Sequence, residues 1–281
     1  MSKLKCDCSV RESVKLAPGV FSLWLLAPEI VKQAVPGQFV SLYCGEKDRL
    51  LPRPISICEL DAEQGLLRLV FRVVGAGTQE FSSLSAGDTV EVLGPLGNGY
   101  VREEGEPLLI GGGDPLLIGG GESLLIGGGI GVPPMLELAK QASGSGHVTV
   151  VLGYRDCHTF LKDEFEKYGT VFVATEDGSV GTKGTVLDAI TRHHICDETD
   201  GGRSFDTICA CGPAPMLRGV KAFGLERGIV TYLSLEERMA CGIGACLGCV
   251  CQTTSIDPHS KVKNARVCKD GPVFLSTDVE V

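Results

Sequence analysis

Apolar and polar residues alternate in short runs over the first hundred residues of the chain. Four such runs stand out, at residues 20–25, 39–43, 66–74 and 89–93. Turn-forming pairs such as Pro36-Gly37 lie between them. Short alternating runs that are regularly spaced and separated by turn residues predict an antiparallel β-barrel.

The pattern changes between about residues 105 and 230. Here apolar runs typical of buried strands alternate with stretches of helical periodicity, which predicts βαβ units, a parallel sheet and a ligand crevice at the carboxyl ends of its strands. We therefore expect a barrel domain at 1–103, an α/β nucleotide-binding domain at 104–230 and a small cysteine-rich domain at 231–281. The predicted strands are 124–126, 148–152, 171–174 and 207–210, and the predicted helices are 134–142, 161–167, 186–192 and 215–227.

Three near-identical octads, PLLIGGGD, PLLIGGGE and SLLIGGGI, follow one another over residues 107–130. A period of eight residues is too short for a solenoid unit. Only one copy can be the first strand and glycine turn of a βαβ unit, and the third copy directly precedes a predicted helix. We assign this role to the third copy, and we expect residues 107–122 to be a duplicated insertion that forms a surface loop.

Four cysteines near the C-terminus, Cys241, Cys246, Cys249 and Cys268, are spaced as C-x4-C-x2-C followed by a longer gap. This is the ligand order of plant-type [2Fe-2S] sites. Small residues lie between the first three, as expected where the backbone wraps closely around a cluster and directs N–H groups at its sulfurs. The spacing predicts a one-electron iron–sulfur centre.

Other roles for these cysteines fit the pattern less well. Structural zinc usually takes two C-x2-C pairs, and the segment has one. Disulfides are disfavoured because the sequence shows neither a signal peptide nor a membrane-spanning run, which indicates a cytoplasmic protein in a reducing environment. Cys251 could replace Cys249, but the resulting C-x4-C-x4-C spacing fits the ligand pattern worse. We leave Cys251 outside the ligand set.

Composition narrows the classes of ligand and partner. The 281 residues carry a formal net charge of −9 without a basic stripe, which argues against a nucleic-acid partner. The 38 glycines and 6% aromatic residues favour binding of phosphate-bearing ligands through the backbone. No Ser-His-Asp set is recognisable, and the five histidines have no evident partners, so we expect a separate subunit to act on any organic substrate.

Three further motifs suit nucleotide binding. Arg53-Pro54-Ile55-Ser56 lies on a predicted barrel strand, and residues 71–78 run from a strand through two glycines into Thr78 and a predicted helix beginning at Gln79. Backbone N–H groups at such a turn can bind a pyrophosphate, with Arg53 and Arg72 adding charge. In the α/β region, the glycines of residues 127–131 and the CGPAPM segment of residues 211–216 both follow predicted strands. Alone, each also fits an ordinary turn.

Together, these motifs resemble the ferredoxin-reductase family, and the cysteine segment is similar to that of the electron transfer subunits of dihydroorotate dehydrogenase B. The similar segments are MACGIGAC at residues 239–246 and VCKDGPVF at residues 267–274. The resemblance covers the chain except for the octad insertion. It implies a flavin-binding barrel, a parallel-sheet nucleotide-binding domain and a small C-terminal [2Fe-2S] domain, with FAD and the cluster as cofactors and NAD as co-substrate.

The resemblance also implies roles for individual residues. Cys241, Cys246, Cys249 and Cys268 would hold the cluster. The cofactor-binding residues would be Arg53, Pro54, Ile55, Ser56, Val70, Phe71, Arg72, Gly77, Thr78, Gly128, Gly129, Gly131, Cys211 and Gly212.

The function implied is electron transfer in pyrimidine biosynthesis. A catalytic subunit carrying FMN would take electrons from dihydroorotate and pass them through the cluster and FAD to NAD⁺, in a heterotetramer with two copies of each chain. An alternative is the small subunit of a flavin-based ferredoxin:NADP⁺ or sulfide-linked oxidoreductase. In a different class, the chain could be a non-catalytic module whose metal is structural. Neither a nucleic-acid nor a membrane partner is expected.

Overall fold

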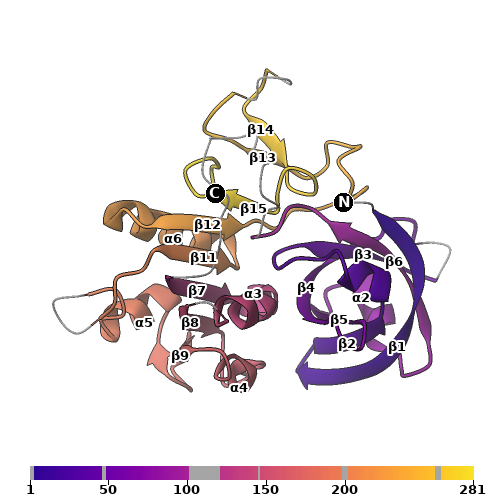
Figure 1. Ribbon diagram of the computed structural model, residues 1–281, viewed down its shortest axis with the longest axis horizontal. Coiled ribbons are helices and arrows are strands. Elements are labelled where there is room, and N and C mark those ends of the chain that lie inside the picture. The colour runs from indigo at the N-terminus through magenta and orange to yellow at the C-terminus, as the bar shows by residue number, and fades with distance from the viewer. Residues whose placement is uncertain (1–2, 46–48, 101–120, 145, 198–201, 257–260) are drawn as a thin grey trace.

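The computed structural model describes residues 3–45, 49–100, 121–144, 146–197, 202–256 and 261–281. An N-terminal barrel and a parallel sheet lie side by side, and the C-terminal segment lies across the top of both in Figure 1. None of the described helices is long and apolar enough to cross a membrane.

The N-terminal part is a closed antiparallel barrel with strand order β1-β2-β5-β4-β3-β6, which confirms the expected architecture. Alternate side chains, among them Val40, Leu42, Ile57 and Leu69, point inward and fill the barrel. The elements are β1 (Leu4–Ala17), β2 (Val20–Leu26), α1 (Pro28–Val31), β3 (Phe39–Tyr43), β4 (Arg53–Asp61), β5 (Leu66–Arg72), α2 (Ala76–Ser82) and β6 (Thr89–Leu96).

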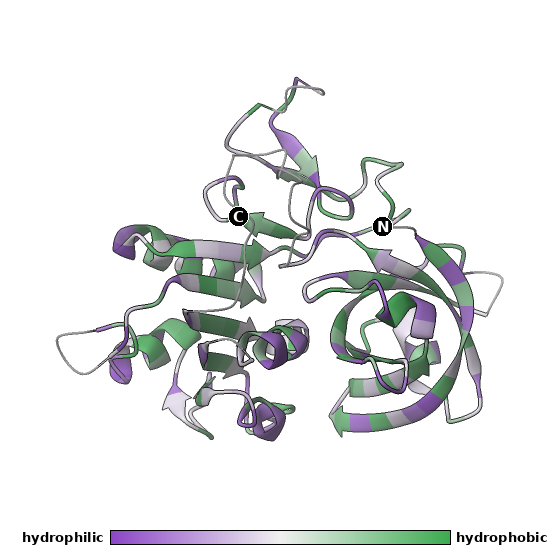
Figure 2. Cartoon of the chain, viewed as in Figure 1, coloured by the Kyte–Doolittle hydropathy of each residue, from purple (hydrophilic) through white to green (hydrophobic). Residues whose placement is uncertain are grey.

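The second part is a seven-stranded sheet of order β10-β9-β8-β7-β11-β12-β15, parallel except for the last pair. Figure 2 shows its central strands as strongly hydrophobic, as expected for strands covered by helices on both faces. Its strands are β7 (Glu122–Gly128), β8 (His147–Tyr154), β9 (Thr170–Thr175), β10 (Thr182–Lys183), β11 (Thr207–Cys211), β12 (Val230–Ser234) and β15 (Val273–Leu275). Its helices are α3 (Pro134–Ala142), α4 (Lys162–Phe165), α5 (Val186–Arg192) and α6 (Ala214–Arg227).

The third octad supplies strand β7, so the prediction for that copy is confirmed. β7 pairs with β8 on one side and β11 on the other, the position at which the strand order reverses. A crevice at the carboxyl ends of β7 and β11 is the usual ligand site of such sheets. The predicted insertion loop falls almost entirely on residues 107–120, which lie outside the described residues.

Two helices differ from the sequence expectation. α2 begins at Ala76 and not at Gln79, because Gly75, in an extended conformation, is already the N-cap of the helix. α4 is limited to Lys162–Phe165, and Leu161 before it has φ +68°. The helix therefore cannot start at Leu161 as predicted.

The C-terminal segment contacts both other parts. It forms a small hairpin of β13 (Val250–Gln252) and β14 (Asn264–Arg266), and its last strand, β15, pairs antiparallel with β12 at the edge of the parallel sheet. Cys249 and Cys268 share one hydrophobic core with Phe39 and Leu96 of the barrel. A Cβ atom added at Gly242 would lie within 4 Å of Ser41, Leu96 and Phe39, so the cysteine-rich segment packs against β3 and β6.

Candidate functional site

Strands β4 and β5 diverge at one end of the barrel. Their pairing runs from Asp61↔Leu66 to Ile57↔Leu69, whereas Arg53–Ser56 pairs with β3 and the end of β5 pairs with β2. Among the described residues, the facing edges of 53–56 and 70–72 thus have no strand partner. Backbone N–H and C=O groups need hydrogen-bonding partners. A flat heteroaromatic ring with donors and acceptors along its edge, such as a flavin, fits this opening.

Side chains along these two edges differ in exposure. Those of residues 53–56 are half-buried and Arg72 is exposed, but Val70 and Phe71 are buried. Phe71 stacks on Phe21, with ring centroids 6.2 Å apart. Of residues 70–72, only the backbone and the side chain of Arg72 can therefore reach a ligand.

The guanidinium group of Arg53 lies against the start of α2. A Cβ atom added at Gly77 would come within 2.6 Å of the Arg53 Nε atom, so the absence of a side chain at Gly77 is what admits the arginine. The Thr78 hydroxyl accepts hydrogen bonds from the N–H groups of Val74 and Gly75, at 2.9 and 3.2 Å, and donates to the Gly75 carbonyl. Thr78 therefore shapes the turn, and Arg53 supplies positive charge beside it, as a phosphate group requires.

The two glycine-containing motifs of the sheet meet at its carboxyl edge. A Cβ atom at Gly131 would lie 2.4 Å from the Cys211 carbonyl oxygen, and one at Gly128 would lie 2.5 Å from the sulfur of Met216. These glycines thus allow the turn after β7 to touch the turn after β11. Gly129, with φ +57°, has no atom within 4 Å of the corresponding position. The backbone at Gly129 is therefore open to a ligand.

Sequence reasoning missed Glu236 at the same edge. It follows β12, whose Ser234 is paired with Cys211. Although Glu236 keeps part of its surface exposed, protein atoms packed around its carboxyl group desolvate it and raise its pKa. Burial, and next the charge of Glu236, raise the pKa of the Cys211 thiol. β12 (Val230–Ser234) was not among the predicted strands, so the sequence reasoning had no strand end at which to place Glu236.

Backbone N–H groups converge on the sulfurs of the C-terminal cysteines. Gly244 donates to Cys268 Sγ at 3.1 Å, Cys246 to Cys241 Sγ at 3.3 Å, and Cys268 to Cys249 Sγ at 3.4 Å. Burial opposes ionisation of Cys241, but the N–H groups of Cys246, Ile243 and Ala245 outweigh it and lower its pKa to about 6. Burial and the nearby Cys249 raise the pKa of Cys268 to about 12. N–H groups of this kind stabilise thiolate ligands.

Two hydrogen-bonded pairs of thiols lie together at this site. Cys241 interacts with Cys246 and Cys268 with Cys249, and the charge of Cys241 also acts on Cys268 across the pairs. Among the described residues, which include all four, no three of these sulfurs lie within 4.8 Å of one another. A single tetrahedral zinc ion with Zn–S bonds of about 2.3 Å would hold all four within about 4 Å of each other. The arrangement therefore fits a two-iron cluster better than zinc.

Cys251 lies apart from these pairs in its packing. It is part of β13, where it is paired with Ala265, and its side chain is only 8% exposed. Burial raises the pKa of its thiol to about 11. A buried strand position of this kind suits a small apolar core residue.

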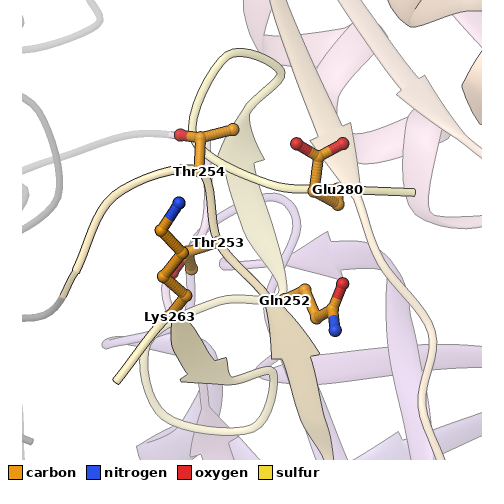
Figure 3. A pocket seen from close by; sticks show the side chains of 5 residues that line it. All are labelled: Gln252, Thr253, Thr254, Lys263 and Glu280. Carbon is orange, nitrogen blue, oxygen red and sulfur yellow. The ribbon is translucent and has the colours of Figure 1, made fainter. Parts of the chain in front are cut away.

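Strand β3 lies between the two candidate cofactor sites. Its Ser41 is paired with Pro54 of the predicted flavin strand, and its Phe39 is in the same core as Cys249 and Cys268. The arrangement places a one-electron site beside the opening between β4 and β5. A separate polar pocket of about 290 Å³, shown in Figure 3, lies in the C-terminal segment and contains none of the predicted site residues. Its lining residues are Gln252, Thr253, Thr254, Lys263 and Glu280.

Three family models match successive parts of the chain. Residues 6–100 match an oxidoreductase FAD-binding domain, and residues 125–222 match an oxidoreductase NAD-binding domain. Residues 236–280 match the iron–sulfur cluster binding domain of dihydroorotate dehydrogenase B. These three matches correspond to the barrel, the parallel sheet and the cysteine-rich segment.

Whole-chain relatives agree with these domains. A protein from Fusobacterium nucleatum is 41% identical over 98% of both chains, and one from Listeria welshimeri is 43% identical over 99% of this chain and all of its own. Both are named dihydroorotate dehydrogenase B (NAD(+)), electron transfer subunit. A solved structure of an NADH-dependent reduced ferredoxin-NADP oxidoreductase is 31% identical, with a TM-score of 0.79, and the match covers 97% of this chain and 89% of that one.

Proposed function

The chain belongs to the family of electron transfer subunits of dihydroorotate dehydrogenase B, and on this premise we propose that it carries electrons from an FMN-containing catalytic subunit to NAD⁺. It is an oxidoreductase subunit with FAD-binding, NAD-binding and iron–sulfur domains. The observation that carries the proposal is the position of β3, with the predicted flavin strand on one side and the loop that follows Cys241 packed against it at Gly242.

Each proposed cofactor has residues that suit it. The edges of Arg53–Ser56 and 70–72 would bind the flavin ring, and Arg53 beside Gly77 would bind its phosphates. The four paired cysteines would hold the cluster, with N–H groups stabilising their charge. Bound flavin exchanges a hydride with nicotinamide and single electrons with an iron–sulfur cluster, so it links the two kinds of carrier.

The nucleotide would bind at the carboxyl edge of the sheet. There, the open backbone at Gly129 can approach phosphate groups, and the turn of Cys211 and Gly212 forms the opposite wall. Glu236 also lies at this edge, where desolvation raises the pKa of its carboxyl group.

A catalytic partner is implied by the names of the relatives, which are electron transfer subunits of a dehydrogenase. We propose that dihydroorotate is oxidised on the partner, in an assembly of two copies of each subunit.

The test is to co-express the chain with its catalytic partner, purify the complex and measure NAD⁺ reduction by dihydroorotate. We expect activity from the complex and none from either chain alone. NAD⁺ reduction by the partner alone, or none by a complex that contains FMN, FAD and the cluster, would contradict the proposal.

The similarity to the ferredoxin-NADP oxidoreductase favours one second candidate, a small subunit of that type of enzyme. Rapid reduction of the flavin by NADPH with little reduction by NADH would support this candidate over the first.

A further inference from the structure

Helix α3 of the nucleotide-binding sheet is hydrogen-bonded to the backbone of a single residue of barrel strand β4, Leu60. The Leu60 N–H donates to Oε2 of Glu137 at 2.8 Å, and the Leu60 carbonyl accepts from Nζ of Lys140 at 2.9 Å. Gln141 also donates to Glu137 Oε1 at 2.9 Å. Both helix residues thus bind the polar groups of one barrel residue 77 and 80 positions earlier in the chain.

The geometry of β4 explains why Leu60 needs partners outside the barrel. β3 pairs with β4 only over Arg53–Ser56, so β3 has ended before Leu60 is reached. Leu60 pairs with Leu67 on its other edge. The side chains of Glu137 and Lys140 therefore occupy the place that a longer β3 would have filled. They bind the backbone N–H and C=O groups of Leu60, which would otherwise be buried without hydrogen bonds.

A buried ionic contact joins the same two parts of the chain nearby. Arg68 of β5 binds both carboxylate oxygens of Glu164 in α4, and it also binds Glu59 of β4 at 3.1 Å. Lys140 lies 3.7 Å from Glu59, which connects the two sets of contacts. Arg68 is 7% exposed and Glu137 is 3% exposed. Charged groups so deeply buried fix geometry, since breaking one pair leaves its partner uncompensated.

Helix α3 and strand β4 connect the contact at Leu60 to the two proposed nucleotide sites. Along α3, Glu137 is six residues after Gly131 in the glycine turn, about 9 Å of helical rise. Along β4, Leu60 is four residues after Ser56 at the end of the predicted flavin strand, about 13 Å of strand. Figure 1 shows α3 between the sheet and the barrel. A shift at Leu60 would therefore move the glycine turn relative to the flavin opening.

We propose that Glu137 and Lys140 are positioning residues, which hold the nicotinamide-binding turn at the correct distance from the flavin by binding the backbone N–H and C=O groups of Leu60. This inference rests on the proposed function. Displacement of reacting groups by about 1 Å can slow a reaction by up to roughly 100-fold. A contact that served only to hold the domains together would affect stability and leave the transfer distance unchanged.

The test uses the purified holoprotein and anaerobic stopped-flow mixing with NADH. Glu137→Leu removes the acceptor for Leu60 N–H at similar size, and Lys140→Met removes the donor to its carbonyl. Glu137→Gln keeps an acceptor oxygen and serves as the conservative rescue. Glu166→Gln is the matched control, because Glu166 pairs with Lys162 within the nucleotide-binding part.

We expect Glu137→Leu and Lys140→Met to lower the limiting rate of flavin reduction by roughly 10- to 100-fold, with the dissociation constant for NADH changed less than about threefold. The long-wavelength charge-transfer absorbance between nicotinamide and flavin should weaken in parallel. Hydrogen exchange of the peptide that contains Leu60 should accelerate in Glu137→Leu and remain slow in Glu137→Gln. The control should match the wild type in all three measurements.

A folded Glu137→Leu protein with the wild-type limiting rate and charge-transfer band would overturn the inference, as would a loss confined to NADH affinity. If Glu137→Leu does not fold, the same criteria apply to Lys140→Met, whose side chain is 35% exposed in the wild type. Failure of wild-type protein to oxidise NADH at all would instead refute the proposed function.

Discussion

Gly242 packs so closely on Ser41 that an added Cβ atom would lie 2.9 Å from the serine Oγ atom. Gly242 follows the cluster cysteine Cys241, and Ser41 is 1% exposed on β3 and paired with Pro54. One strand of backbone therefore separates the cysteine loop from the predicted flavin strand. Gly242 also has φ +67°, a conformation that favours glycine.

Gly242→Ala should therefore lift the cysteine loop from the barrel. The left-handed backbone alone costs roughly 1–3 kcal/mol, and the contact with Ser41 adds to it. We expect fewer iron and sulfide ions per chain and faster loss of visible absorbance on warming. Gly228→Ala is the control, since Gly228 has φ +66° but no atom within 4 Å of the added Cβ. If both variants had the same iron and sulfide content and lost their visible absorbance equally fast, the close packing of Gly242 on Ser41 would have no special role.

The ligand assignment predicts opposite outcomes for two neighbouring cysteines. Cys249→Ser should lose most of the cluster, because Cys249 is paired with Cys268 at the site. Cys251→Ser should keep it, because Cys251 is a strand residue paired with Ala265. Iron and sulfide analysis with the visible spectrum of each variant checks this. Loss of the cluster in Cys251→Ser and its retention in Cys249→Ser would show that Cys251, and not Cys249, is the third ligand.

Arg53 should contribute strongly to FAD affinity. Hydrogen bonds to charged groups contribute about 1.5–3 kcal/mol, so Arg53→Met should weaken FAD binding by roughly 10- to 100-fold. Arg192→Met, at the far end of α5, should bind FAD like the wild type. Fluorescence titration of flavin-depleted protein measures both. An unchanged affinity in Arg53→Met would remove Arg53 from the phosphate site.

Glu137 should make stability depend on pH. Burial raises its pKa above 4.5, opposed by hydrogen bonds from Leu60 and Gln141 and by Lys140, while Glu59 adds to the rise. The native state therefore keeps a proton that the unfolded chain releases, and the free energy of unfolding falls as pH rises from about 4.5 through the raised pKa. The phenol of Tyr168, which interacts with Glu137, stays neutral throughout, since its pKa is also raised.

The comparison to make is wild type against Glu137→Gln, which cannot titrate, by urea unfolding between about pH 5 and 7. The stability of the wild type should decline relative to the variant as pH rises. A constant difference would show that the carboxyl group does not titrate abnormally.

Local patterns in the sequence were sufficient for most of the fold. Alternation identified the barrel strands β2, β3, β5 and β6 but not β1, and the helix after the third octad singled out the copy that forms β7. The divergence of β4 from β5 was not predictable, because the alternation within one strand does not specify where its neighbours stop. Glu137 was missed for a related reason: on its own helix it resembles a solvated residue, and only Leu60, distant in sequence, buries it.

Anaerobic titration of the purified chain with NADH, followed by visible and electron paramagnetic resonance spectra, tests whether electrons pass from the nicotinamide through the flavin to the cluster. We expect that NADH bleaches the flavin, that the signal of a reduced [2Fe-2S] cluster follows, and that roughly three electrons enter each chain, two at the flavin and one at the cluster. A colourless zinc protein, or a coloured one whose spectra NADH leaves unchanged, would contradict it.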